Sequence, residues 1–134
     1  MSDVSANFIN PEGMHRPTGY THVVEVTAGR PVYISGQVAL DGAGELVGPG
    51  DVAAQARQVF ENLQAALGSV GAGFEQVVKL TVYLVDATQM PAVREVRDRY
   101  VDTARPPAST AVEVRRLVRD DLLVEVEAVA VLPP

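Results

Sequence analysis

The chain contains no cysteine and no tryptophan, and it has fewer cationic residues than acidic ones. Without cysteine there is no disulfide, no thiolate nucleophile and no zinc site built on thiolates. Eleven lysine and arginine residues against 17 aspartate and glutamate residues give a net charge of −6. Nucleic-acid binding depends on cations that displace phosphate counterions, so this balance predicts no nucleic-acid partner. The absence of a polybasic run likewise predicts no membrane partner.

Long apolar runs are also missing. No uninterrupted run approaches the roughly 18 residues of a membrane span, and residues 1–7 have neither the positive nor the apolar segment of a signal peptide. We therefore expect a cytoplasmic protein. What is present is an ordinary globular composition, 47% apolar and 21% charged over 134 residues. That length predicts one domain spanning residues 1–134.

Two segments have helical periodicity. Residues 52–67 place apolar side chains at i, i+3, i+4 and i+7 spacing, with Asp51 as the expected N-cap. A second apolar stripe runs over residues 90–101, with Thr88 as the expected cap. Alternating apolar residues predict strands at about 22–26, 32–40, 78–84, 112–115 and 122–132. The expected order is therefore β-β-α-β-α-β-β, with the first ten residues loosely held.

The last predicted strand alternates apolar and acidic positions. Val124 and Val126 point to one face, whereas Glu125 and Glu127 point to the other. Two helices can cover only one face of the sheet, so the face that carries these carboxylates among β-branched residues is left open. The simplest way to cover this face is to bury it against other copies of the chain, which predicts a homo-oligomer.

Familiar motifs for cofactors and metals are absent. Residues 42–48 resemble a dinucleotide-binding glycine motif, but the spacing is one residue too long and the segment lies in a predicted hairpin. The two histidines, His15 and His22, lack the spacing of a metal pair and are interpreted as loop residues. We expect no metal and no cofactor. The residues alone predict an oligomeric α+β domain with a carboxylate site, and no particular reaction.

Four stretches, taken in order, resemble the Rid family of reactive-intermediate deaminases, which is also called the YjgF, translation-inhibitor or L-PSP endoribonuclease-like family. They are Arg-Pro-Thr-Gly-Tyr-Thr-His at 16–22, Ile-Ser-Gly-Gln-Val at 34–38, Gly-Asp-Val-Ala-Ala-Gln-Ala-Arg-Gln at 50–58 followed by Asn-Leu at 62–63, and Val-Glu-Val-Glu-Ala-Val-Ala at 124–130. The resemblance extends over residues 10 to 132 without large gaps.

The resemblance implies a chorismate-mutase-like fold, with a six-stranded mixed sheet and two helices on one face. It also implies a homotrimer whose sheets form a central barrel, with three clefts between neighbouring subunits. Characterised members hydrolyse enamine or imine products of pyridoxal-phosphate enzymes, such as 2-aminoacrylate, to a 2-keto acid and ammonia. They use no metal or cofactor, so the implied ligand is a small molecule.

By the same resemblance, Glu125 matches the glutamate that positions or activates water, and Tyr20 and Gly36 match cleft residues. Each has a structural alternative. Tyr20 is otherwise a packing residue at a subunit seam, and Gly36 permits a bulge or a close approach of strands. Glu125 is otherwise an interface charge paired with Arg115 or Arg116.

One position departs from the family pattern. Deaminating members have Pro-Ala-Arg-Ser where this chain has Pro-Ala-Ser-Thr at 107–110, so Ser109 replaces the arginine that binds the substrate carboxylate. 2-Aminoacrylate deamination is therefore doubtful. Arg94 and Arg97 lie on the second predicted helix, where those members have asparagine and an aromatic residue. Arg94 is a candidate replacement cation or else a solvated helix residue, and His22 is a further candidate for the cleft.

Three functions follow as hypotheses. The first is a cofactor-free hydrolase or deaminase of a small reactive imine, enamine or carbonyl metabolite. The second is a non-catalytic trimer that binds or senses a small molecule. The third is an endoribonuclease that inhibits translation, which the net charge of −6 and the seven aromatic residues (three Phe, four Tyr) disfavour.

Overall fold

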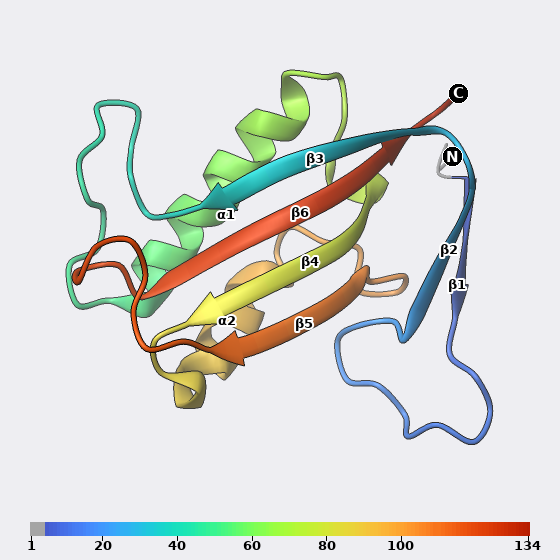
Figure 1. Cartoon of the computed structure of the whole chain (residues 1–134), viewed down its shortest axis with the longest axis horizontal. Helices are drawn as coiled ribbons and strands as arrows, with labels where there is room; N and C mark the ends of the chain where they lie inside the picture. Colours follow the sequence, from blue (N-terminus) through green and yellow to red (C-terminus); the bar gives the residue numbers. More distant parts are fainter. Residues whose placement is uncertain (1–4) are drawn as a thin grey trace.

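The computed structural model of the chain describes residues 5–134, which form a four-stranded sheet, a separate two-stranded hairpin and two α-helices (Figure 1). The strands are β1 (Ser5–Ile9), β2 (Val23–Ala28), β3 (Arg30–Gln37), β4 (Val77–Leu84), β5 (Ala108–Glu113) and β6 (Val124–Leu132). The helices are α1 (Val52–Gly68) and α2 (Met90–Arg97), with 3-10 turns η1 (Phe74–Gln76) and η2 (Ala87–Gln89). The larger sheet has the order β3-β6-β4-β5 and is mixed, because β4 and β5 run parallel and the other pairs antiparallel.

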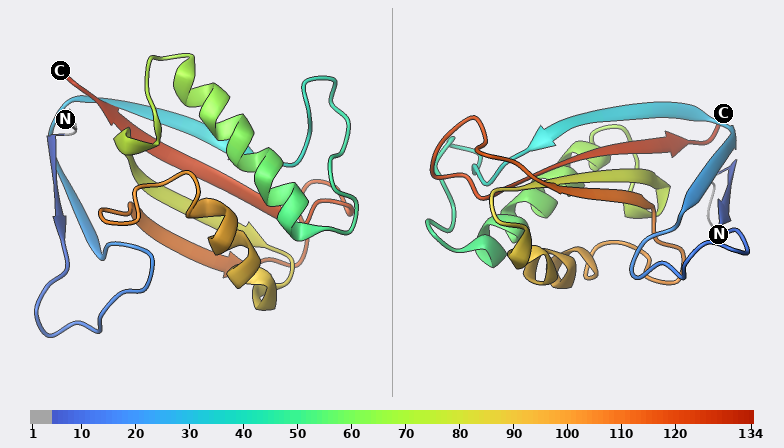
Figure 2. Two further views of the ribbon diagram at one scale, coloured as in Figure 1. Left: turned by 180° about the vertical axis from the view of Figure 1, so that it is seen from behind. Right: turned by 60° about the horizontal axis from the view of Figure 1, so that its bottom comes forward.

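Both helices lie against one face of the larger sheet, and the opposite face carries no element of residues 5–134 (Figure 2). The side chains follow this asymmetry. In β6, Val124, Val126, Ala128 and Ala130 are buried beneath the helices, whereas Glu125, Glu127 and Val129 lie on the open face and are only partly buried. The alternation predicted from the sequence is thereby confirmed.

Helix α1 begins and ends where its sequence predicts. The Asp51 side chain caps it by accepting a hydrogen bond from the Ala54 amide at 3.1 Å. Its inward side buries Ala56, Val59, Phe60, Leu63 and Leu67 against β6 and β3. None of the helices in residues 5–134 combines the length and the apolar content that a membrane crossing needs.

Helix α2 differs from its prediction at both ends. Its expected cap, Thr88, instead donates its backbone N–H and its hydroxyl to Asp86 Oδ1, so Asp86 caps the preceding turn. The helix stops at Arg97 rather than near residue 101, because the Tyr100 amide bonds to the Arg97 carbonyl three residues back. This tighter turn brings the Tyr100 ring onto Phe60, with ring centroids 5.3 Å apart. The apolar stripe is thus buried without being helical throughout.

The six strands do not form one sheet, which corrects the expected six-stranded arrangement. The chain leaves β2 through Gly29, whose φ of +124° brings its backbone against Val131 and Leu132 at the end of β6. A side chain at position 29 would overlap both residues, so only glycine allows this close turn. The β1–β2 hairpin therefore projects beside the sheet (Figure 1). Residues 5–9, expected to be loosely held, pair with β2 in this hairpin; residues 1–4 lie outside the described residues.

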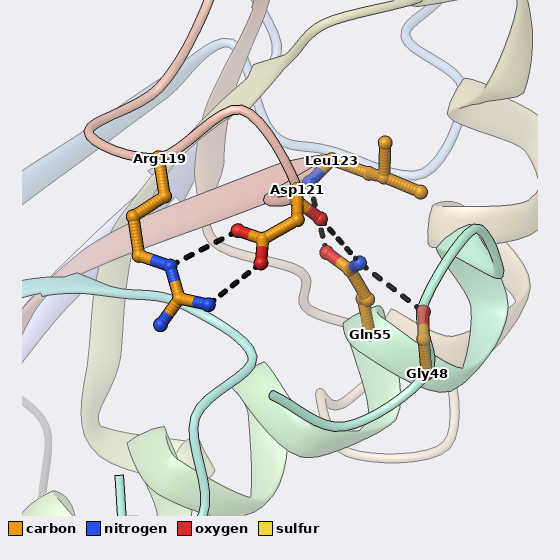
Figure 3. Close-up of polar contacts among 5 residues, drawn as sticks. All are labelled: Gly48, Gln55, Arg119, Asp121 and Leu123. Carbon is orange, nitrogen blue, oxygen red and sulfur yellow. Dashed lines mark hydrogen bonds and ion pairs between the residues drawn. The ribbon is translucent and has the colours of Figure 1, made fainter. Parts of the chain in front are cut away.

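A buried amide holds the loop that leads into β6 (Figure 3). The Gln55 side chain on α1 is fully buried, and its Nε2 donates to the carbonyls of Gly48 at 3.2 Å and Asp121 at 3.0 Å. Its Oε1 accepts the Leu123 amide at 2.8 Å. On the outer side of the loop, Arg119 binds the Asp121 carboxylate with two nitrogens, at 3.0 and 2.6 Å. Together these bonds fix the backbone immediately before β6.

We expect Gln55→Met to lower the free energy of unfolding by about 3 kcal/mol, because an apolar side chain of similar size leaves the Asp121 carbonyl and the Leu123 amide without partners and removes one of the two hydrogen bonds to the Gly48 carbonyl. Urea denaturation measures the change. The matched control is Gln64→Met, at an exposed position on the same helix, which should leave stability nearly unchanged. Equal stability of the two variants would show that the Gln55 bonds do not hold this loop.

Candidate functional site

Glu125 and Gly36 meet on the open face of the sheet, where β3 ends and β6 begins. The pairing of the two strands shifts register between Ile34 and Gln37, which leaves Gly36 in a bulge. The Glu125 carboxylate lies directly over this glycine. A Cβ on residue 36 would overlap Glu125 Oε2 and lie 2.8 Å from its Cδ. The sequence predicted either a bulge or a close approach at Gly36, and the structure has both. The group that approaches Gly36 closely is the carboxylate of Glu125, the candidate catalytic residue.

Within residues 5–134 the Glu125 carboxylate is partly buried and has no basic partner. Burial raises its pKa above the usual glutamate range, and the negative charge of Glu127 raises it further. Glu127 is itself held, because the Tyr83 hydroxyl donates to it at 2.7 Å. Within residues 5–134 no ion pair involves Glu125, and Arg116 pairs with Asp120 at 3.1 Å instead. A raised pKa makes this carboxylate a stronger base than an ordinary glutamate, which favours proton transfer from water.

Tyr20 and His22 lie together in the loop between β1 and β2, with a partner that the sequence interpretation did not assign. His15 Nε2 is 2.9 Å from the Tyr20 hydroxyl, and His22 Nε2 donates to the His15 carbonyl at 2.7 Å. The His15 and His22 rings meet edge to face, with centroids 4.8 Å apart. A hollow of about 540 Å³ opens beside them. The spacing of two histidines around a tyrosine is a weak clue, and only the folded loop shows that they form one cluster.

This loop rests on the segment between α2 and β5. The Thr21 amide donates to the Pro107 carbonyl at 3.2 Å, and its hydroxyl donates to the Pro106 carbonyl at 2.5 Å. Ser109 follows on β5, opposite Leu80. Since directly paired residues of neighbouring strands point to the same face and Leu80 is in the core, Ser109 lies on the helix face.

Two arginines of α2 reach the same loop. Arg97 is only 2% exposed, and its Nε and Nη2 bond to Asp98 Oδ1 at 3.1 and 3.0 Å. Gly19, with φ of +78°, covers it so closely that a Cβ there would lie 2.5 Å from Arg97 Nη2 and 3.7 Å from Arg94 Cδ. Arg94 is partly buried, so it is not a fully solvated helix residue. No three metal-ligating side chains converge anywhere in the described part of the chain.

The candidate residues thus form two groups within one chain. Glu125 and Gly36 lie at the end of the sheet where β6 begins, on the open face. Ser109 lies near the start of β5, at the other end of the sheet, and the loop that carries Tyr20 is bonded to the segment just before β5 and contacts Arg94 through Gly19. Within residues 5–134 part of the length of β4 separates Ser109, which pairs with Leu80, from Glu125, which pairs with Tyr83 near the end of the strand.

The raised pKa of Glu125 predicts a specific pH dependence of stability. The folded chain keeps the Glu125 proton to higher pH than the unfolded chain does. The free energy of unfolding should therefore fall as pH rises through the ordinary glutamate range to the raised folded pKa, and stay lower above it. Glu125→Gln removes this fall, so the variant should match the wild type below about pH 4 and be more stable at neutral pH.

Urea denaturation across this pH range, at fixed protein concentration, tests the pH dependence. Exposed Glu45→Gln is the control that changes the same net charge. A constant difference between Glu125→Gln and the wild type at every pH would contradict a raised Glu125 pKa.

Known proteins share both the sequence and the fold. The Endoribonuclease L-PSP family matches residues 13–132. A RutC family protein from Synechocystis is 46% identical over 103 residues, covering 76% of this chain and 78% of that protein. The 2-iminobutanoate/2-iminopropanoate deaminase of Mus musculus is 41% identical over 116 residues, covering 86% and 82%. A Yersinia pestis structure described as YyfB of the Rid family is 38% identical, with a TM-score of 0.86 over 96% of this chain and 99% of that one. The chain therefore belongs to the Endoribonuclease L-PSP family, which includes the YjgF, RutC and Rid proteins.

Proposed function

We propose that this chain is a cofactor-free hydrolase that deaminates a small reactive imine or enamine. The observation that carries the proposal is the Glu125 carboxylate, which lies over Gly36 with a raised pKa and no basic partner in residues 5–134. The name of the mouse relative, an imine deaminase 41% identical to this chain, supports the same reaction class.

The chemistry requires one base that also acts as an acid. Protonation of an enamine substrate at carbon gives the iminium, which is also the protonated form of an imine substrate. Glu125 takes a proton from water while the water oxygen bonds to the iminium carbon, giving a neutral carbinolamine. Glu125 then returns this proton to nitrogen, and the carbon–nitrogen bond breaks while the carboxylate takes the hydroxyl proton, so that ammonia and a carbonyl product leave. Because residue 36 has no side chain, the Glu125 carboxylate can lie against the backbone at this point.

The proposed site lies between copies of the chain, in a homotrimer whose open sheet faces line a central barrel. Tyr20 and Ser109 of one copy would then face Glu125 of its neighbour. Two features support this arrangement. The two groups of candidate residues lie at opposite ends of the sheet, and the open face exposes Tyr33 (78%) and Val112 (41%) on its outer strands. In the proposed trimer these side chains and the uncovered sheet face would be buried between copies.

Turnover and assembly of a single variant test the proposal. Serine or threonine dehydratase generates 2-aminoacrylate or 2-iminobutanoate, and lactate dehydrogenase reports release of the keto acid. Glu125→Gln should slow turnover by about 10²–10⁴-fold, because it removes the base and keeps the shape. Light scattering should give three times the mass of one chain for both proteins. Unchanged turnover, or a stable monomer, would contradict the proposal.

A non-catalytic trimer that binds a small molecule is the second candidate, and Ser109 favours it. A serine hydroxyl cannot replace a guanidinium that binds a carboxylate through two parallel hydrogen bonds. If the wild type binds keto acids but accelerates no imine hydrolysis, the chain is a binding protein that retains the cleft.

Ser109→Arg should raise kcat/KM for 2-aminoacrylate about tenfold or more, because a charge-assisted hydrogen-bond pair to the carboxylate is gained. The coupled dehydratase assay measures it. Thr110→Arg is the matched control, since Thr110 is the next residue of β5 and lies on the opposite face, bonded to Lys79. Equal rates in the two arginine variants would remove Ser109 from the cleft.

A further inference from the structure

The Arg94 side chain has an unmet hydrogen-bonding requirement. Its Nε is fully buried and has no hydrogen-bond partner among residues 5–134. A buried N–H of a guanidinium without an acceptor is unfavourable, and native proteins rarely retain one without a reason. Its neighbour one turn along, Arg97, is buried more deeply and is paired with Asp98. Of the two arginines of α2, Arg97 therefore has an acidic partner, whereas the Arg94 Nε has no acceptor among residues 5–134.

The acidic residues nearest to Arg94 on the helix are already engaged. Asp98, four residues along and the natural partner for an i,i+4 pair, accepts both of its bonds from Arg97. Glu95 pairs with Arg99 at 3.2 Å. Within the described chain, then, no carboxylate forms an ion pair with Arg94, although Asp98 lies at the i+4 position where such a pair would form.

Arg94 lies next to the loop that carries Tyr20. Its Cδ lies 3.7 Å from the position that a Cβ on Gly19 would occupy, and the next residue is Tyr20 at the edge of the 540 Å³ hollow. Thr21 connects the same loop to Pro107, two residues before Ser109. Ser109 faces the helix side of the sheet, where α2 lies. The chain thus lacks a cation at position 109 of β5 and has an arginine with an unpartnered Nε on α2, next to the loop that is bonded to the segment just before β5.

From this juxtaposition we propose that Arg94 binds a carboxylate of the substrate, with its Nε–H and one terminal N–H donating to the two carboxylate oxygens. This edge of a guanidinium matches a carboxylate when both nitrogens are free to donate. The substrate class is then an imine or enamine that carries a carboxylate, rather than a neutral carbonyl compound. The imine or enamine part of this substrate rests on the proposed function, whereas its carboxylate is inferred from Arg94 alone.

Binding of an unreactive carboxylate tests the inference without turnover. Isothermal titration compares 2-oxobutanoate with butanone, which has the same carbonyl and no carboxylate. The wild type should bind 2-oxobutanoate at least tenfold more tightly than butanone. Arg94→Gln, which keeps most of the side-chain volume and loses the charge, should abolish this preference. Arg94→Lys should retain part of it, because an ammonium supplies charge without the two-pronged geometry.

Arg99→Ala is the matched control, an exposed arginine of the same region that is paired with Glu95. It should bind 2-oxobutanoate as the wild type does, and circular dichroism with light scattering should show all variants folded and assembled alike. The inference is overturned if Arg94→Gln keeps the wild-type preference, or if the wild type has none. The result also separates the two proposals. If binding depends on Arg94 but no imine is turned over, the hydrolase proposal is refuted and the Arg94 carboxylate site stands. If imine is turned over but binding does not depend on Arg94, the carboxylate site is refuted and the hydrolase proposal stands.

Discussion

The buried amide of Gln55 is the constraint on which the arrangement of the open face depends. It ties helix α1, the Gly48 turn and the loop at Asp121–Leu123 to one point, and β6 starts immediately afterwards. Because side chains alternate along a strand, the position of the first residue decides which face every later residue occupies. A slip of one residue at Leu123 would move Glu125 under the helices and Val124 onto the open face. One neutral side chain in the core thus determines where the acidic side chains lie.

Local sequence patterns predicted the elements that depend on local chemistry. The Asp51 cap, the inward stripe of α1 and the alternation of β6 were all readable, because each follows from spacing along one segment. The four matching stretches gave the family for a similar reason, since they preserve residue types in order. The exposure of Glu125 and its neighbour Glu127 also followed from the alternation alone.

The remaining features depend on contacts between distant segments. The separate hairpin results from the close passage of Gly29 over Val131, which no spacing in either segment indicates. The burial of Arg97 depends on Gly19, and the shortened α2 depends on Tyr100 reaching Phe60. The division of the candidate residues between two ends of the sheet required the strand order. The family resemblance assigns Tyr20 and Glu125 to clefts between neighbouring copies, and this stays a prediction, because a motif gives residue types and not the copy that supplies each of them.

The attachment of the Tyr20 loop to Pro106 and Pro107 has a consequence for ligand binding. Both prolines have fixed φ angles, and Pro106 is restricted further because a proline follows it, so this backbone has few alternative conformations. Thr21 donates hydrogen bonds to the carbonyls of Pro106 and Pro107. The loop that forms this wall of the hollow is therefore attached to a rigid segment. A ligand that enters beside Tyr20 meets a surface that is preorganised, and little conformational entropy is lost in shaping it. Affinity at this wall should therefore depend mainly on the fit of the ligand to a rigid outline.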